Sequence, residues 1–154
     1  MKLDINVQKL ESLMKNFYVL TGIRMVLFDT DGQEIFSYPN YDCAFCKKMK
    51  NRPETGHLCR KSDQASFNQC RETGRLIIYR CHAGLIEAAA PLMDQDTVIG
   101  YMMLGQISDS ENSVDVPVKT YDQIEAAAKK MEASTFYIIF KDAVKARRNN
   151  FIAN

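Results

Sequence analysis

The chain has 154 residues, of which 46% are hydrophobic and 25% are charged, and its 20 lysines and arginines nearly balance 19 aspartates and glutamates. This composition excludes a disordered chain, and a formal net charge of +1 gives no field that would attract nucleic acid or anionic lipid. The length predicts a single domain over residues 1–154. No apolar run approaches the roughly 18–20 residues of a membrane span, and the N-terminus lacks a secretory signal pattern, so we expect a cytoplasmic domain.

The N-terminal segment, residues 4–21, is predicted to be helical. Its apolar residues recur every three or four positions, Asp4 is the expected N-cap, and Gly22 stands where a helix commonly ends. Two short apolar runs at 25–28 and 34–38 follow on either side of an Asp/Gly turn. This pattern predicts a β-hairpin directly after the helix.

Residues 43–73 combine cysteines and basic residues with scattered apolar positions. We expect a short helix near 44–50 and a second helix near 62–72. Pro53 and Gly56 act as helix breakers and predict a loop between these two helices.

Three strands are predicted after these helices. An Asp-Gln-Asp turn at 94–96 separates the last two, which should form a hairpin. The expected strands lie at residues 76–81, 85–92 and 98–107.

Residues 120–149 are expected to form two C-terminal helices. Thr120 and Gln123 open the first with a T-x-x-Q capping box, in which hydroxyl and amide satisfy free backbone N–H groups. The second begins at 134 or 135 and ends in the basic stretch 145–148. Positive charge is favourable at a helix C-terminus, so this stretch indicates a solvated helix end.

The order helix, two strands, helices, three strands, helices predicts an α+β fold. A five-stranded, mostly antiparallel sheet with flanking helices, placed on one side, would bury the apolar faces. The core is expected at 23–108, between the helical N-terminus and the C-terminal helices. Such a sheet curls around a small apolar cavity, which is a common place for a ligand.

Five cysteines cluster within 39 residues, and their odd number without a secretory signal favours thiols or metal ligands over disulfides. A C-x-x-C spacing lets two sulfurs converge on one ion, and Zn²⁺ takes four ligands. The alternative is that these cysteines are buried or redox-active thiols. Cys70 is expected to be a core thiol. The candidate zinc ligands are Cys43, Cys46, Cys59 and Cys81.

Polar residues in the predicted strands could line the cavity. Glu87 interrupts an apolar strand and Gln106 ends another, so each either points outward or offers hydrogen bonds to a small diol or alcohol. His82 is either a core histidine or a cavity residue. Adjacent strand residues point to opposite faces, which argues against a Cys81–His82 nucleophile. Without a Gly-rich phosphate loop, G-x-S-x-G or H-E-x-x-H, we expect no enzyme.

Several short strings together resemble the PocR sensory domain, a PAS-like ligand-binding module of bacterial transcription regulators and sensor kinases. The resemblance covers roughly residues 5–145. The resemblance implies a small hydrocarbon derivative such as propanediol as the ligand. The residues of this chain that match the family pattern are Cys46, Cys59, Cys81, His82 and Gln106. Cys43 and Cys70 are additions in this chain. The strings are Phe45-Cys46, Cys59 with Ser62-Asp63, Tyr79-Arg80-Cys81-His82-Ala83-Gly84-Leu85, Ala89-Ala90-Pro91 and Gly105-Gln106.

The leading hypothesis is therefore a small-molecule-binding sensory domain of a bacterial signalling or transcription regulatory system. Its terminal helices would pass the signal to an output domain, a partner protein or a second copy in a homodimer, without direct contact to nucleic acid or membrane. The alternative is a cysteine-based redox or metal sensor on the same fold. The expected ligand-binding residues are Tyr79, His82, Glu87 and Gln106.

Overall fold

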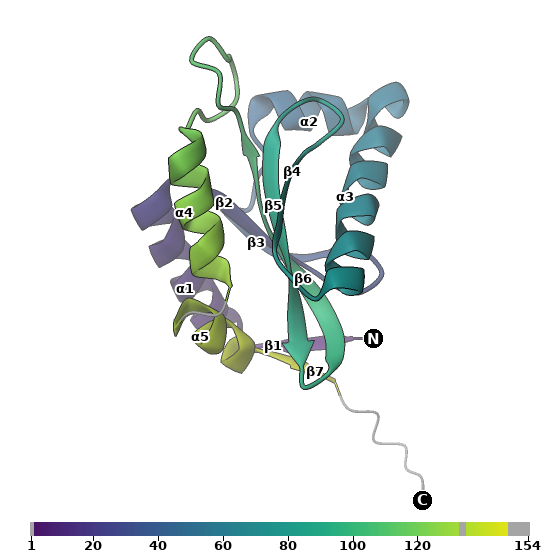
Figure 1. Ribbon diagram of the computed structural model, residues 1–154, viewed down its shortest axis with the longest axis vertical. Coiled ribbons are helices and arrows are strands. Elements are labelled where there is room, and N and C mark those ends of the chain that lie inside the picture. Colours follow the sequence, from purple (N-terminus) through teal and green to yellow (C-terminus); the bar gives the residue numbers. More distant parts are fainter. Residues whose placement is uncertain (1, 133–134, 148–154) are drawn as a thin grey trace, which may run out of the picture.

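Five strands of the computed structural model form one antiparallel sheet in the order β3-β2-β6-β5-β4 (Figure 1). The structure describes residues 2–132 and 135–147. Helices flank this sheet, so the predicted α+β architecture is confirmed. The strands are β2 (Arg24–Phe28), β3 (Glu34–Tyr38), β4 (Ile77–Arg80), β5 (Ile86–Asp94) and β6 (Thr97–Ile107).

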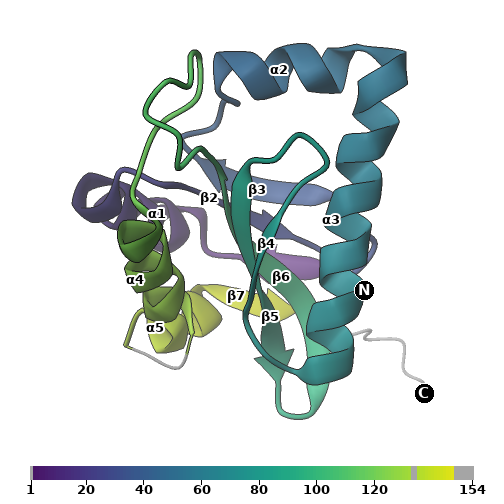
Figure 2. The ribbon, with the colours of Figure 1, turned by 45° about the horizontal axis from the view of Figure 1, so that its top comes forward.

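Helices cover both faces of the sheet, whereas the sequence predicted them on one side (Figure 2). Two hydrophobic cores therefore lie on the two faces. In the larger core, residues of α1, α4 and α5 pack with alternate strand residues, and in the smaller core residues of α3 pack against the opposite face. In β6, Met102 and Leu104 belong to the first core, while Tyr101 and Met103 belong to the second. A strand that is apolar on both faces requires a layer on each. The helices are α1 (Val7–Thr21), α2 (Ala44–Asn51), α3 (Pro53–Thr73), α4 (Tyr121–Met131) and α5 (Thr135–Ala143).

The predicted loop between the second and third helices is wrong, because α3 begins at Pro53 and runs for 21 residues. Proline is well placed in the first turn of a helix, where its missing N–H has no partner to lose. Gly56 lets α2 and α3 approach closely, since a Cβ at this position would lie 2.7 Å from the carbonyl oxygen of Lys50.

The two ends of the described chain pair as strands. Strand β1 (Leu3–Ile5) lies antiparallel to β7 (Val144–Ala146). The N-cap of α1 is therefore Asn6 rather than Asp4, and its side chain accepts from the N–H of Lys9 at 3.1 Å.

The C-terminal helices follow the prediction in part. The capping box at Thr120 and Gln123 is confirmed, with hydrogen bonds of 2.9 and 3.2 Å. The last helix ends at Ala143, and part of the basic stretch forms β7, where Val144 is buried against the larger core. Residues 134, 148 and 149 of the expected helices lie outside the described residues. No helix in the described ranges is long and apolar enough to cross a membrane.

Candidate functional site

A small cavity lies between the sheet and the α2–α3 pair. Its volume is about 50 Å³. A single water needs roughly 10–15 Å³, so the cavity has room for a molecule with a few non-hydrogen atoms. Its apolar wall consists of Val26, Phe28, Phe45, Met49, Leu85 and Met103. Its polar and sulfur-bearing wall includes Arg24, Glu34, Cys46, Lys50, Cys59, Asp63, Cys81, His82, Glu87 and Gln106.

Two of the carboxyl groups that line this cavity have raised pKa values. Burial raises the pKa of Glu87 on β5 to about 8, and the nearby Asp63 carboxylate raises it further. Burial likewise raises the pKa of Asp63 on α3 to about 6, although the charge of Lys50 opposes this shift. At neutral pH, Glu87 is therefore mostly a neutral donor and acceptor, while Asp63 is mostly a carboxylate.

A bulge in β6 makes room for Glu87. The pairs Ile86–Ile107 and Ala88–Leu104 leave Gly105 and Gln106 opposite the single residue Glu87. A Cβ at Gly105 would lie 2.6 Å from Glu87 Oε2, so the missing side chain leaves space for the carboxyl.

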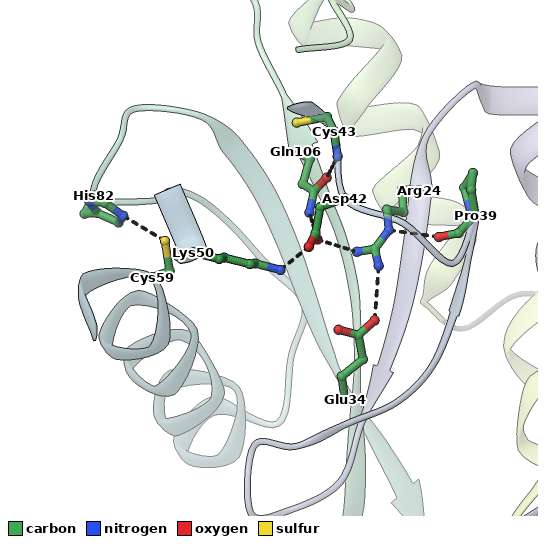
Figure 3. A network of polar contacts seen from close by, with 9 residues as sticks. All are labelled: Arg24, Glu34, Pro39, Asp42, Cys43, Lys50, Cys59, His82 and Gln106. Carbon is green, nitrogen blue, oxygen red and sulfur yellow. Dashed lines mark hydrogen bonds and ion pairs between the residues drawn. The ribbon is translucent and has the colours of Figure 1, made fainter. Parts of the chain in front are cut away.

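Gln106 connects this bulge to the beginning of α2. Its Oε1 accepts from the Cys43 N–H at 2.7 Å, and its Nε2 donates to Asp42 Oδ1 at 2.6 Å (Figure 3). The same carboxylate oxygen accepts from Lys50 Nζ at 2.8 Å. Arg24 lies 3.7 Å from Asp42, and its Nη2 donates to Glu34 Oε1 at 3.1 Å.

This network links the residues just before α2, and Lys50 near its end, to Gln106 on the sheet. None of the residues in α2 is fully buried, so hydrophobic packing holds the helix only weakly. Burial raises the pKa of Asp42, but the hydrogen bond and charge of Lys50, together with the Gln106 hydrogen bond and the charge of Arg24, outweigh burial and hold that pKa below its usual value.

Three of the four predicted zinc ligands line the cavity, namely Cys46, Cys59 and Cys81. The Cys59 Sγ lies 3.1 Å from His82 Nε2 (Figure 3). Cys43 is instead the N-cap of α2. Within the described residues there is no group of three or more His, Cys, Asp or Glu side chains that could hold a metal ion. The zinc site at Cys43, Cys46, Cys59 and Cys81 stays a prediction.

Cys70 lies in the core, whereas Cys43 and Cys46 affect each other's pKa. The Cys70 side chain has 0% exposure, and its thiol donates to the Ala89 carbonyl at 3.3 Å, which confirms the predicted core thiol. A hydrogen bond from the Cys46 thiol lowers the pKa of Cys43 to about 6, with help from the backbone N–H of Cys46. The same contact, followed by burial, raises the pKa of Cys46. All five cysteines are free.

Three of the four residues expected to bind a ligand line the cavity: His82, Glu87 and Gln106. The Cys81–Leu85 turn, with Gly84 at φ 83°, lets both Cys81 and His82 reach it. Tyr79 lies outside the lining, and its hydroxyl faces Met103 Sδ at 3.8 Å.

Sequence reasoning missed Asp63, Lys50, Arg24 and Glu34. Asp63 could have been found, because it follows Cys59 by four positions and therefore shares a helix face with that cysteine. The other three look like ordinary surface charges in the sequence. They come together only through the folding of separate elements around the cavity.

Comparison with known proteins gives one broad match. The family described as the sensory domain found in PocR matches residues 4–145. The regulatory protein PocR of Salmonella typhimurium is 29% identical over 103 residues, which are 67% of this chain and 34% of that protein. The chain thus matches only about a third of the length of this curated relative.

Two solved structures show weak overall likeness. The C-terminal domain of a putative transcriptional regulator from Vibrio cholerae is 14% identical, with a TM-score of 0.40 and coverage of 90% of this chain and 93% of that one. An IclR transcriptional regulator from Alicyclobacillus acidocaldarius is 17% identical, with a TM-score of 0.42 and coverage of 89% and 68%. These likenesses are too distant to support an argument about function.

Proposed function

The chain belongs to the family of sensory domains found in PocR, and on this basis we propose that it binds a small organic molecule in the cavity beneath α2 and α3. The observation that carries the proposal is a cavity with a largely apolar surface whose wall also holds the carboxyl groups of Glu87 and Asp63, and burial raises the pKa of both. Ligand sites typically combine an apolar lining with a few polar groups that fix orientation.

A short hydrocarbon derivative such as a diol suits this wall. Its carbon atoms would contact Phe45 and Met103, one hydroxyl would donate to Asp63, and another would exchange hydrogen bonds with Glu87. His82 and Gln106 are proposed as further contacts. The size of the cavity favours a ligand of a few heavy atoms over a nucleotide or a sugar.

The binding signal would pass to an output domain, a partner protein or a second copy of the chain, as part of bacterial transcription regulation. The relative named regulatory protein PocR supports this reading, since the matched segment is only 34% of its length. In this proposal the domain works in the cytoplasm and is not an enzyme. Its role is to favour one arrangement of helices when the ligand is bound, without touching DNA or membrane itself.

Thermal unfolding tests the proposal directly. The melting temperature is measured with increasing 1,2-propanediol, ethanol or propionate for the wild type, for Glu87→Leu and for Glu72→Leu, an exposed control on α3. Ligand at about 100 times Kd should stabilise the wild type by about 2.7 kcal/mol, which is roughly 5–10 °C for this size. The control should respond equally, and Glu87→Leu much less. No shift with any compound, or an equal shift in Glu87→Leu, would contradict cavity binding.

A second candidate function is a cysteine-based redox or metal sensor. The observation that favours it is the approach of Cys59 Sγ to His82 Nε2 at 3.1 Å, beside Cys46 and Cys81 on the same cavity. Metal analysis of protein purified without chelator, combined with thiol counting, tests this function. One tightly bound zinc per chain would support metal sensing. Freely reactive Cys43, Cys46, Cys59 and Cys81 in folded protein without bound metal would contradict metal sensing.

A further inference from the structure

The Cys81–Leu85 turn forms part of the cavity wall. Within the turn, the Cys81 N–H donates to the Leu85 carbonyl at 2.9 Å, and the Gly84 N–H donates to the Cys81 carbonyl at 2.9 Å. These two bonds fix the shape of the turn but not its position relative to the rest of the wall. The residues of the turn that line the cavity are Cys81, His82, Ala83 and Leu85.

Hydrogen bonds join this turn to neighbouring elements. The His82 N–H donates to Ser62 Oγ of α3 at 3.1 Å. Arg80, the last residue of β4, donates from Nη1 to the Gly84 carbonyl at 3.1 Å. The same guanidinium binds both carboxylate oxygens of Asp109, with an Nη1–Oδ1 distance of 3.2 Å and an Nη2–Oδ2 distance of 2.8 Å. Arg80 therefore connects the turn to the segment that follows β6.

Asp109 comes directly after a backbone pairing that fixes its own position. The Ser108 N–H donates to the Pro117 carbonyl at 2.9 Å, and the Lys119 N–H donates to the Ser108 carbonyl at 3.0 Å. Lys119 comes shortly before α4, which packs in the larger core. Through Arg80, the turn is therefore connected to a point that is anchored at the end of β6 and near the start of α4.

We propose that Arg80 is a positioning residue of the cavity, which together with Asp109 holds the Cys81–Leu85 turn where its side chains can contact a ligand. A guanidinium suits this role, because its planar set of donors binds two carboxylate oxygens and a carbonyl in fixed directions. A lysine ammonium is a point charge on a flexible stem, so it cannot hold the same three contacts in one geometry.

The exposure of the pair separates positioning from global stability. The Arg80 and Asp109 side chains are 54% and 34% exposed, and ion pairs in such surroundings add little to the free energy of unfolding. Loss of the pair should therefore act on the turn rather than on the whole fold. The inference deepens the proposed ligand binding and rests on it for the effect on affinity, whereas the hold on the turn can be measured without any ligand.

Arg80→Lys in the full chain tests the proposal, because this variant keeps the charge and loses the fork of donors. Arg75→Lys is the matched control, since Arg75 is an exposed arginine outside the cavity lining. Amide exchange of the ligand-free proteins is followed by NMR. The Kd of 1,2-propanediol is taken from the rise of the melting temperature with concentration. Arg80→Gln, Asp109→Asn and the double variant complete a double-mutant cycle for this Kd.

In Arg80→Lys, the amides of residues 81–85 should exchange at least about fivefold faster than in the wild type, and the Kd of 1,2-propanediol should rise at least about threefold. The melting temperature without ligand should stay within about 4 °C of the wild type. Arg75→Lys should match the wild type in all three measurements. The double variant should weaken binding no more than either single variant, because each of them already breaks the pair.

Unchanged exchange of residues 81–85 in Arg80→Lys would overturn the proposal. An unchanged Kd would overturn it as well, but would leave the proposed ligand binding in place. Faster exchange in α1 and β6 to the same extent would show a general loss of stability and would also contradict a positioning role. If 1,2-propanediol does not bind the wild type, that result counts against the proposed function, and the exchange of the turn decides whether Arg80 holds it.

Discussion

Gln106 shows how a single residue can serve the architecture of a site more than its chemistry. Its backbone lies at φ 62°, a conformation that glycine adopts readily and other residues rarely. Each polar atom of its amide already has one partner, on Cys43 or Asp42. A ligand that binds the Gln106 amide would have to share it with these existing hydrogen bonds. The neighbouring Glu87 carboxyl also lines the cavity. We therefore expect Glu87 to dominate ligand recognition and Gln106 to hold α2 in place.

The raised pKa of Glu87 predicts a pH-dependent stability. The folded protein keeps a proton on Glu87 up to about pH 8, whereas the unfolded chain releases it near its ordinary value of 4.5. Stability therefore falls as pH rises through this range and levels off above about pH 8. Asp63, with a pKa of about 6, is about half ionised at pH 6 and almost fully ionised at pH 8, so it titrates in the lower half of this range.

Glu87→Gln should remove this dependence, because the amide cannot ionise. In ligand-free protein, the melting temperature of Glu87→Gln relative to the wild type should rise by roughly 5–9 °C between pH 6 and pH 8. Taking the difference between the two proteins at each pH cancels other titrations, including that of Cys43. Glu72→Gln, on the exposed face of α3, should show no such trend. A constant difference across this range would mean that Glu87 is ionised in the folded protein.

At the scale of secondary structure, α2 depends on polar contacts where the other helices depend on burial. Asp42 Oδ1 accepts from both Lys50 and Gln106. Asp42→Asn keeps the size of the side chain but removes the charge that draws in Lys50. Global stability should fall by only about 1 kcal/mol, since the pair is partly exposed.

The local effect of Asp42→Asn should be larger than the global one. Amide hydrogen exchange over residues 44–51 should quicken severalfold, because this helix opens without disturbing the core. Asp109→Asn is the matched control, since Asp109 also pairs with a cation, Arg80, but contacts neither α2 nor the network. Equal exchange of α2 in both variants would show that packing, rather than Asp42, holds this helix.

The sequence predicted the strands well and the helix boundaries less well, for physical reasons. Strands β5 and β6 were found because long apolar runs bounded by turn residues have few other interpretations. Pro53 and Gly56 were misread because the same residues that break a helix interior also suit a first turn and a close helix contact. The start of α1 was misplaced because both Asp4 and Asn6 are good N-caps, and only pairing with the distant β7 decides between them.

At the scale of the whole molecule, the sequence does not predict which residues from distant segments come together around the cavity. Glu87, Gln106 and the cysteines stood out locally, but Lys50 and Asp42 gained meaning only when α2 folded over the sheet (Figure 3). Because helices cover both faces, the sheet separates the cavity from the paired chain ends. The cavity lies under α2–α3, while the paired strands β1 and β7 pack with α1 and α5 in the larger core. A signal from cavity to chain ends must therefore cross the sheet.

Strands β1 and β7 hold the chain ends together, and two kinds of contact support this pairing. Val144 is 1% exposed and packs in the larger core, whereas the Arg147–Asp4 ion pair has side chains 55% and 56% exposed. Burial outweighs a screened surface pair. Val144→Ala should therefore cost about 2 kcal/mol, and Arg147→Ala less than about 1 kcal/mol.

Urea unfolding at 50 mM and 500 mM NaCl measures both effects. The loss in Val144→Ala should be the same at the two salt concentrations, because a cavity in an apolar core is not screened. Any small loss in Arg147→Ala should fade at the higher salt, because exposed charges are screened over roughly 10 Å or less. The backbone bond from the Arg147 N–H to the Lys2 carbonyl remains in that variant and limits its effect. A larger loss for Arg147→Ala than for Val144→Ala would mean that charge, and not burial, joins the two ends.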